Sequence, residues 1–259
     1  MDRKSYWNDS YAKYWRDRVA EAARDGAASD VVRGDAKTEG DEIYERIFES
    51  HPFRPGAILD VGCAWGRMFP IFRRAGLRVS GIDISDAMIA QCRQGWGAEA
   101  FIDRIEAAEA ETLPFADSAF DNLACLAVFD ATFQDRALAE FMRVLAPGGH
   151  LYLTGKNATY HDDDALAFDA EVGARRKGHP NFFTDAPEML RQLAAGGHTV
   201  VAGYYFARRG DFAEFRHVRE LPDSFYEYLL VVHRGTGPAV FTEFSSAFSK
   251  TFQKRTGTG

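Results

Sequence analysis

The chain has 259 residues, which is enough for one large α/β domain with appended segments. Its 46% hydrophobic and 27% charged residues are ordinary for a globular protein, and its net charge of −7 excludes a sequence-wide basic field that would draw it to nucleic acid or to an anionic membrane. No apolar run is long enough to cross a bilayer and the first residues form no apolar signal region, so we expect a cytoplasmic protein without membrane or nucleic-acid partners.

The first predicted element is an amphipathic helix over residues 5–23, whose aromatic face must dock on another part of the protein. Residues 24–41 are small, polar and charged, and they predict a long loop of the functional or mobile kind. A helix over residues 41–50 follows. The aromatic residues that recur at helical intervals in the first helix are Trp7, Tyr11, Tyr14 and Trp15.

Residues 57–61 predict a short buried strand, and a turn of small residues follows it, Gly62-x-Ala64-x-Gly66. The turn opens a helix that we expect to begin near Arg67. A backbone without bulky side chains lets a ligand approach closely, and the start of a helix points unpaired N–H groups at whatever is bound. The stretch therefore predicts a nucleotide-type binding turn. It is not the dinucleotide fingerprint G-x-G-x-x-G, because Arg67 stands where the third glycine belongs.

Strands and helices then alternate, as expected of a doubly wound parallel sheet. Residues 78–83 predict a strand that ends in Asp83, and Ser85 is a good capping residue for the next helix. The near-continuous apolar run of residues 122–129 is typical of a strand buried on both faces. The other predicted elements are a helix at 85–94, a weakly marked strand at 102–107, a helix at 136–145 and a strand at 150–154.

The C-terminal third begins with residues 157–180, which follow no regular pattern and predict an inserted cap. Asp185–Glu188 resembles a capping box with proline in the first turn, and its helix should end at Gly196. Two strands are predicted at 199–206 and 225–233. The phenylalanines of the tail predict a final amphipathic helix with a buried face, formed by Phe241, Phe244, Phe248 and Phe252.

Four motifs stand in order between residues 55 and 155. They are D-x-G-x-A-x-G from Asp60, the strand that ends in Asp83, the run A-E-A-E-T-L-P-F followed by S-A-F-D, and the L-A-P-G-G turn from Leu145. Together they resemble the class I S-adenosylmethionine (SAM)-dependent methyltransferases, in the ubiquinone/menaquinone-biosynthesis-like branch of small-molecule enzymes. The resemblance implies an α/β fold with a Rossmann-like, doubly wound, seven-stranded sheet, an antiparallel edge hairpin, and a helical cover from the N-terminus and the insertion.

The resemblance also implies SAM as the cofactor, S-adenosylhomocysteine as its product, and a set of contacts. Asp60 would order the loop or meet the amino group of SAM, Asp83 would accept the ribose hydroxyls, and Glu109 with the N–H of Ala110 would read the adenine edge. The expected cofactor-binding residues are Asp60, Gly62, Cys63, Ala64, Gly66, Asp83, Ile84, Glu109, Ala110 and Leu126.

We expect no metal in this site. Metal-assisted O-methyltransferases place a carboxylate after the fourth strand and an Asp-Asn pair after the fifth, where this chain has Leu126 and Lys156-Asn157. The three cysteines, Cys63, Cys92 and Cys125, show no metal-binding spacing and are read as reduced thiols.

A general base is needed only if the acceptor begins protonated. The catalytic candidates are His161, which stands beside three aspartates, and Asp130, just past the fourth predicted strand. The substrate-contact candidates are Phe129 and Tyr14, whose ring could lie over the sulfonium. Each has a plainer alternative, which for His161 is a solvent-facing position in an acidic loop and for Tyr14 a packing contact.

The sequence therefore predicts metal-independent transfer of a methyl group from SAM to an O or N atom of a small organic molecule. Residues 1–50 would form the helical cover with its mobile loop, and 51–259 the SAM-binding domain with a cap insertion at about 157–180. A SAM-binding regulatory or scaffolding protein without turnover, an NAD-dependent oxidoreductase, and a homodimeric assembly stay open.

Overall fold

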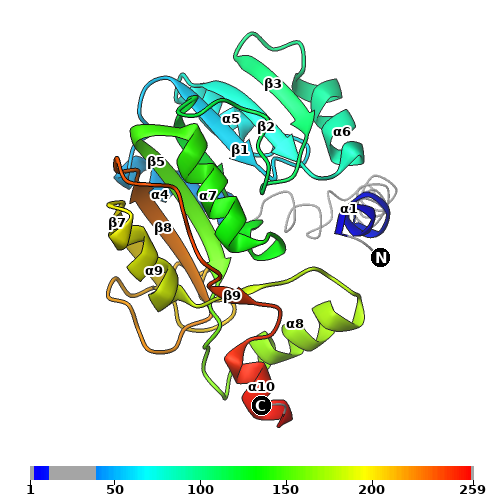
Figure 1. Ribbon diagram of the computed structural model, residues 1–259. Helices are drawn as coiled ribbons and strands as arrows, with labels where there is room; N and C mark the ends of the chain where they lie inside the picture. Colours follow the sequence, from blue (N-terminus) through cyan, green and yellow to red (C-terminus); the bar gives the residue numbers. More distant parts are fainter. Residues whose placement is uncertain (1–2, 12–38, 258–259) are drawn as a thin grey trace.

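The computed structural model describes residues 3–11 and 39–257. A seven-stranded sheet runs through this part of the chain (Figure 1). From one edge to the other its strands are β3 (Ile102–Ala107), β2 (Arg78–Asp83), β1 (Ala57–Val61), β4 (Phe120–Cys125), β5 (Leu145–Lys156), β8 (Glu227–His233) and β7 (Thr199–Phe206).

The first five strands pair in parallel, whereas β8 pairs antiparallel with both β5 and β7. The chain winds outward from β1 to β3 and then crosses back to β4 on the other side of β1. The carboxyl ends of β1 and β4 therefore flank a topological switch point, where open α/β sheets bind their ligands. The predicted seven-stranded, doubly wound sheet with an antiparallel edge is confirmed.

Helices cover both faces of the sheet (Figure 1). The helices α4 (Glu39–Ser50), α5 (Phe69–Arg74) and α6 (Asp86–Trp96) pack on one face, and α7 (Gln134–Val144) and α9 (Ala186–Ala195) pack on the other. Successive residues of β1 point to opposite faces of the sheet. Ile58 packs on the face that α4, α5 and α6 cover, and Leu59 packs on the face that α7 and α9 cover. This is why the parallel strands read as continuous apolar runs.

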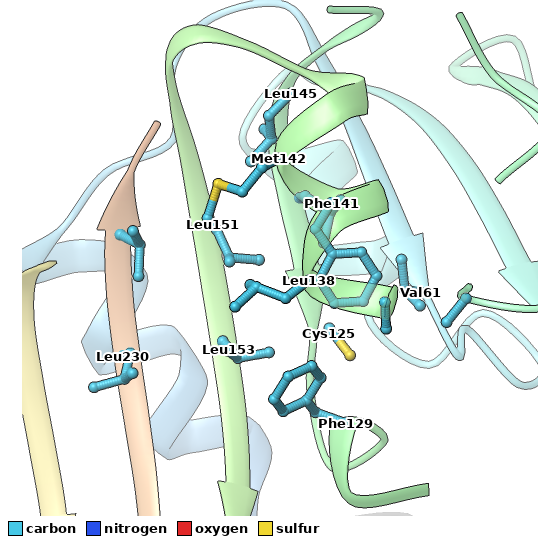
Figure 2. Packing of buried hydrophobic residues seen from close by; sticks show 14 of the residues in the cluster. Val61, Cys125, Phe129, Leu138, Phe141, Met142, Leu145, Leu151, Leu153 and Leu230 are labelled. Carbon is cyan, nitrogen blue, oxygen red and sulfur yellow. The ribbon is translucent and has the colours of Figure 1, made fainter. Parts of the chain in front are cut away.

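The best-filled layer lies between α7 and the sheet. Leu138, Phe141 and Met142 of α7 are fully buried and point toward the strands, where they meet Leu151 and Leu153 of β5 (Figure 2). Truncating a buried phenylalanine such as Phe141 to alanine typically costs about 3–5 kcal/mol. The layer fixes the position of the segment that connects β4 to α7, which borders the binding edge of the sheet.

Shorter elements complete the described chain. They are α1 (Arg3–Ser5), the π-helix η1 (Tyr6–Tyr11), the 3-10 helix η2 (Phe129–Ala131), α8 (Ala165–Arg176), α10 (Lys250–Thr256), and a two-stranded pairing of β6 (Phe183–Thr184) with β9 (Ser245–Ser246). Of the amphipathic helix predicted over residues 5–23, only the part up to residue 11 lies within the described residues.

Two sequence expectations need correction, one on a predicted strand and one on the tail. The apolar run of residues 122–129 is not one strand, because β4 ends at Cys125 and the backbone turns at Ala127, where φ is +58°. Phe129 is buried in η2 rather than in a strand, and apolar composition alone does not separate a buried strand from a buried turn. The insertion at 157–180 contains helix α8 at its centre, as expected of a helical insertion, although its sequence shows no regular pattern.

The phenylalanine-rich tail was also expected to be one helix, but helix α10 covers only residues 250–256. Phe244 is buried against α7's side of the sheet from an extended segment, and Phe248 is 39% exposed. The spacing of the phenylalanines reflects separate contacts along an extended chain rather than one helical face.

Among the described residues, no helix is long and apolar enough to cross a membrane, and no group of three or more His, Cys, Asp or Glu side chains is placed to hold a metal ion. The three cysteines are buried free thiols.

Candidate functional site

The carboxyl ends of β1, β2 and β4 surround a cavity, which we call the strand-end cavity. It lies at the switch point of the sheet and combines acidic side chains with aromatic and aliphatic walls, the composition typical of a small-molecule site. Its lining includes Trp7, Tyr44, Asp60, Ala64, Asp83, Met88, Ala110, Glu111, Leu126 and Thr132.

The turn after β1 brings backbone, rather than side chains, to the cavity. Gly62 has a φ of +76°, and a Cβ at this position would overlap the side chain of Val128. The N–H groups of Gly62 and Cys63 both donate to the carbonyl of Ile82, at 2.8 and 2.9 Å, so the turn is fastened to β2. Helix α5 begins only at Phe69, later than the start predicted near Arg67.

Asp83 ends β2 and connects this turn to the next helix. Its Oδ2 accepts a hydrogen bond from the N–H of Ala64 at 3.0 Å, and its Oδ1 accepts one from the N–H of Ser85 at 2.8 Å. Burial raises the pKa of Asp83, while these two N–H donors oppose the shift. Each carboxylate oxygen has a further lone pair, so Asp83 can still accept hydrogen bonds from a ligand in the cavity.

Asp60 lines the same cavity from β1 and is only 3% exposed. Its Oδ2 is buried and has no hydrogen-bond partner in the described part of the protein. Burial raises the pKa of Asp60 to about 7, against the opposing effect of the nearby Arg67. A buried carboxylate oxygen without a partner is costly, and it marks a place where a ligand can supply the missing donor.

Most of the residues predicted from the sequence to bind the cofactor line the cavity. Gly66 does not, because it packs beside Phe69 and Trp96. Glu109 does not either, since its side chain is 54% exposed and forms an ion pair with Arg3. The predicted cofactor residues that line the cavity are Asp60, Gly62, Cys63, Ala64, Asp83, Ile84, Ala110 and Leu126.

The N-terminal segment contributes residues that sequence reasoning missed. Arg3 lines the cavity, pairs with Glu111, and donates from Nη1 to the carbonyl of Ala131 at 3.4 Å. Trp7 lines the cavity as well, and the side chain of Asn8 accepts hydrogen bonds from the start of α6. Trp7 stood in the predicted aromatic face, but no local pattern marks Arg3 as the partner of an acid more than a hundred positions away.

The segment also reaches the insertion. The hydroxyl of Tyr6 forms a hydrogen bond of 2.9 Å with Nδ1 of His179, and the rings of Tyr6 and Trp7 both meet the His179 ring edge to face. Burial lowers the pKa of His179, so its imidazole is neutral at neutral pH. The expected contact of Tyr14 lies outside the described residues.

The catalytic and substrate candidates that fall within the described residues, Phe129, Asp130 and His161, do not line the strand-end cavity. Phe129 is fully buried between Phe141 and Phe244, so its side chain is part of the core and has no face left for a substrate. Within the described part of the chain, no hydrogen bond joins the His161 ring to a carboxylate, and each of the three neighbouring aspartates has another partner. Asp162 pairs with Lys254, Asp163 pairs with Arg208, and Asp164 caps α8 through the N–H of Ala167 at 3.0 Å.

Asp130 is placed differently. It lies in η2 between two residues that line the cavity, Val128 and Ala131, but its own side chain turns toward Lys156 at the end of β5. The expectation that Asp130 is near the acceptor stays a prediction, and the ion pair changes the role that it can have.

Comparisons with known proteins identify the fold and the family. The profile of a family described as a methyltransferase domain matches residues 59–153. A malonyl-(acyl-carrier protein) O-methyltransferase of Erwinia billingiae is 32% identical over 207 residues, which cover 68% of this chain and 78% of the relative. The chain belongs to the class I SAM-dependent methyltransferases.

Other relatives of this methyltransferase match over shorter stretches. The ubiquinone/menaquinone biosynthesis C-methyltransferase UbiE of Bordetella avium is 38% identical over 103 residues, covering 38% of this chain and 40% of the relative. The chain spans only 39% and 59% of two further malonyl-(acyl-carrier protein) O-methyltransferases, from Pseudescherichia vulneris and Erwinia pyrifoliae.

Solved structures agree on the fold of this methyltransferase. A SAM-dependent methyltransferase from Mesorhizobium loti superposes with a TM-score of 0.56 at 20% identity, covering 73% of this chain and 96% of that one. The (4+2)-cyclase SpnF superposes with a TM-score of 0.55 at 19% identity, covering 76% of this chain and 81% of that one. The second match shows that the fold by itself does not fix the reaction.

Proposed function

We propose that this methyltransferase binds SAM in the strand-end cavity and transfers its methyl group to an O or N atom of a small organic molecule, without a metal ion. The observation that carries the proposal is the unpartnered Oδ2 of Asp60, which is buried beside the cavity next to a second carboxylate, Asp83. SAM offers an ammonium group and two ribose hydroxyls, which can supply the donor that Asp60 lacks and further donors for the remaining lone pairs of Asp83.

The other cavity residues fit the remaining parts of SAM. The side chains of Ile84, Met88 and Leu126 give apolar walls for a flat base, and the turn at Gly62 lets the chain approach closely. When bound, SAM supplies a methyl group activated by a positively charged sulfur. The protein contributes position and the exclusion of water, to which the N-terminal segment with Arg3 and Trp7 adds a cover on the cavity.

The absence of a metal ion is part of the proposal because of the residues at the strand ends. A cation beside β5 would meet the ammonium group of Lys156, which already forms an ion pair with Asp130. The curated relatives include methyltransferases that act on oxygen and on carbon by their names, so the acceptor atom is a proposal that rests on this chain's own site.

Calorimetric titration with SAM, S-adenosylhomocysteine and NAD tests the cofactor. We expect both sulfur nucleosides to bind at micromolar concentrations and NAD not to bind. Binding of NAD in preference to both would contradict the proposal. Mass spectrometry of methyl transfer to added acceptors then separates an enzyme from a protein that binds SAM without turnover.

A further inference from the structure

Four polar residues from separate parts of the chain gather beside the strand-end cavity, and we call them the Lys156 cluster: Asp130, Lys156, Asn181 and Glu227. The strands β5 and β8 lie side by side in the sheet (Figure 1). Lys156 ends β5 and Glu227 begins β8, and because the two residues are register partners across this antiparallel pair, their side chains lie on the same face of the sheet. Asp130 belongs to η2, and two residues close to it line the cavity, Val128 just before η2 and Ala131 at its end.

Lys156 is the centre of the cluster and carries its positive charge. Its Nζ donates to Oδ2 of Asp130 at 2.5 Å and to Oδ1 of Asn181 at 3.3 Å. Burial alone would lower the pKa of Lys156, but Asp130, Tyr226 and Glu227 together outweigh burial and hold this pKa above its usual value. The side chain of Lys156 still keeps 21% of its surface exposed, so the cluster is within reach of a small molecule.

Glu227 is the carboxylate of the cluster that remains available. Within residues 3–11 and 39–257 its side chain makes no hydrogen bond, whereas one oxygen of Asp130 is occupied by Lys156. Burial raises the pKa of Glu227, and the nearby Lys156 and Arg209 only partly oppose this, with Asp130 adding to it. A carboxylate with a raised pKa, such as Glu227, can accept a proton during a reaction, whereas an ion-paired carboxylate, such as Asp130, is suited to positioning its neighbours.

The other groups nearby have partners of their own. Arg209 donates from Nη1 to the hydroxyl of Tyr226 at 2.9 Å, and His179 holds the hydroxyl of Tyr6 through Nδ1. The backbone N–H of Phe182 donates to the carbonyl of Asp130 at 2.6 Å, which keeps the segment with Asn181 against η2. The cluster is therefore preorganised around one free acceptor of protons.

We propose that the Lys156 cluster binds the methyl acceptor, and that Glu227 takes the proton of an uncharged hydroxyl or amine group. The inference rests on the proposed methyl transfer and gives its acceptor a chemical class. The heteroatom's lone pair forms the bond to the methyl carbon, whose former bonding pair stays with the sulfur. The O–H or N–H proton passes to an oxygen of Glu227. A preformed carboxylate needs no such base and would meet Glu227 and Asp130 as like charges.

The test compares the full-length protein with its Glu227→Gln variant, which keeps the shape of the side chain but removes the base. Glu214→Gln is the matched control, because Glu214 is 61% exposed and pairs with Arg216. Transfer from SAM to catechol, tyramine and malonyl-coenzyme A is followed by mass spectrometry. We expect the wild type to methylate a hydroxyl or amine probe rather than malonyl-coenzyme A. Glu227→Gln should lower kcat by about 10²- to 10⁴-fold, with unchanged affinity for S-adenosylhomocysteine.

Wild-type rates in Glu227→Gln, or preferred methylation of malonyl-coenzyme A, would overturn this inference while leaving methyl transfer in place. Loss of transfer in His179→Asn instead would assign the base to the insertion. A wild type that methylates no probe counts against the proposed function. In that case the pKa of Glu227 still decides the inference, and it is measured from the ¹³C signal of its carboxyl group in protein saturated with S-adenosylhomocysteine. A pKa in the ordinary range of an exposed glutamate contradicts the inference.

Discussion

The strand-end cavity and the Lys156 cluster lie at the same edge of the sheet, but the chain builds them in different ways. Asp60 and Gly62 belong to one short stretch, Asp83 and Ser85 to another, and the two stretches are adjacent parallel strands with the turns that follow them. The Lys156 cluster draws one residue each from η2, β5, the segment just after the insertion and β8. In the proposed assignment, the cofactor common to the family would be held by local geometry, whereas the methyl acceptor would meet groups that only the complete fold assembles.

The largest expected effect is on the local side of this comparison. Replacing Asp83 with alanine removes a buried carboxylate that accepts from Ala64 and Ser85 and faces the cavity. Because hydrogen bonds to a charged group contribute about 1.5–3 kcal/mol each, we expect S-adenosylhomocysteine to bind more than about a hundredfold more weakly in calorimetry. Asp86→Ala, at an exposed position three residues on, is the control and should bind as the wild type does.

The Asp83→Ala protein should keep a cooperative unfolding transition. Undiminished binding in that variant would show that the cofactor contacts lie elsewhere. The strand-end cavity would then no longer be an example of a locally built cofactor site.

The second prediction concerns the insertion that carries His179 and that leads directly to Asn181. Glu171 of α8 is buried and accepts hydrogen bonds from the hydroxyl of Tyr160 at 2.9 Å and from Oγ and N of Ser249 at 2.6 and 3.0 Å. Glu171→Ala leaves these buried donors without partners, so we expect the free energy of unfolding to fall by about 2–4 kcal/mol in chemical denaturation. Asp169→Ala, exposed on the same helix, is the control.

Binding of S-adenosylhomocysteine should be nearly unchanged in Glu171→Ala, because the strand-end cavity takes no residue from α8. An equal loss of stability and of binding would mean that the two regions are not separate.

The smallest predicted effect is a pH dependence centred on Asp60, whose pKa is raised to about 7 by burial. The protonated form stabilises the unliganded fold, and this contribution is present below the ordinary pKa of aspartate and is lost as the pH rises through about 7. A ligand ammonium requires the ionised form. S-adenosylhomocysteine should therefore bind about tenfold more weakly at pH 6 than at pH 8.

Calorimetry at the two pH values measures this difference, and Asp60→Asn should remove it. Equal affinity of the wild type at pH 6 and pH 8 would show that Asp60 does not meet the charged group of the ligand.

The sequence predicted the parts of the site that depend on neighbours along the chain. The small-residue turn after β1 and the acid that ends β2 lie at the cavity because parallel strands bring their carboxyl ends to one edge. The prediction failed at Phe129, because an apolar residue can be buried in a strand, in a short helix or against a substrate. Phe129 reads as part of a strand or as a substrate contact, but it is a core residue of η2, since an apolar side chain gives no sign of which surface covers it.

By itself, the sequence determined the order of strands and helices, the binding turn and the family, because these follow from local periodicity and from motifs of consecutive residues. The tertiary structure alone decided that Arg3 pairs with Glu111, that the acids beside His161 are engaged elsewhere, and that Lys156 stands between Asp130 and Glu227. Charged residues far apart in the chain form ion pairs only because the folded sheet brings them close together, and the spacing of residues in the sequence does not predict these pairs.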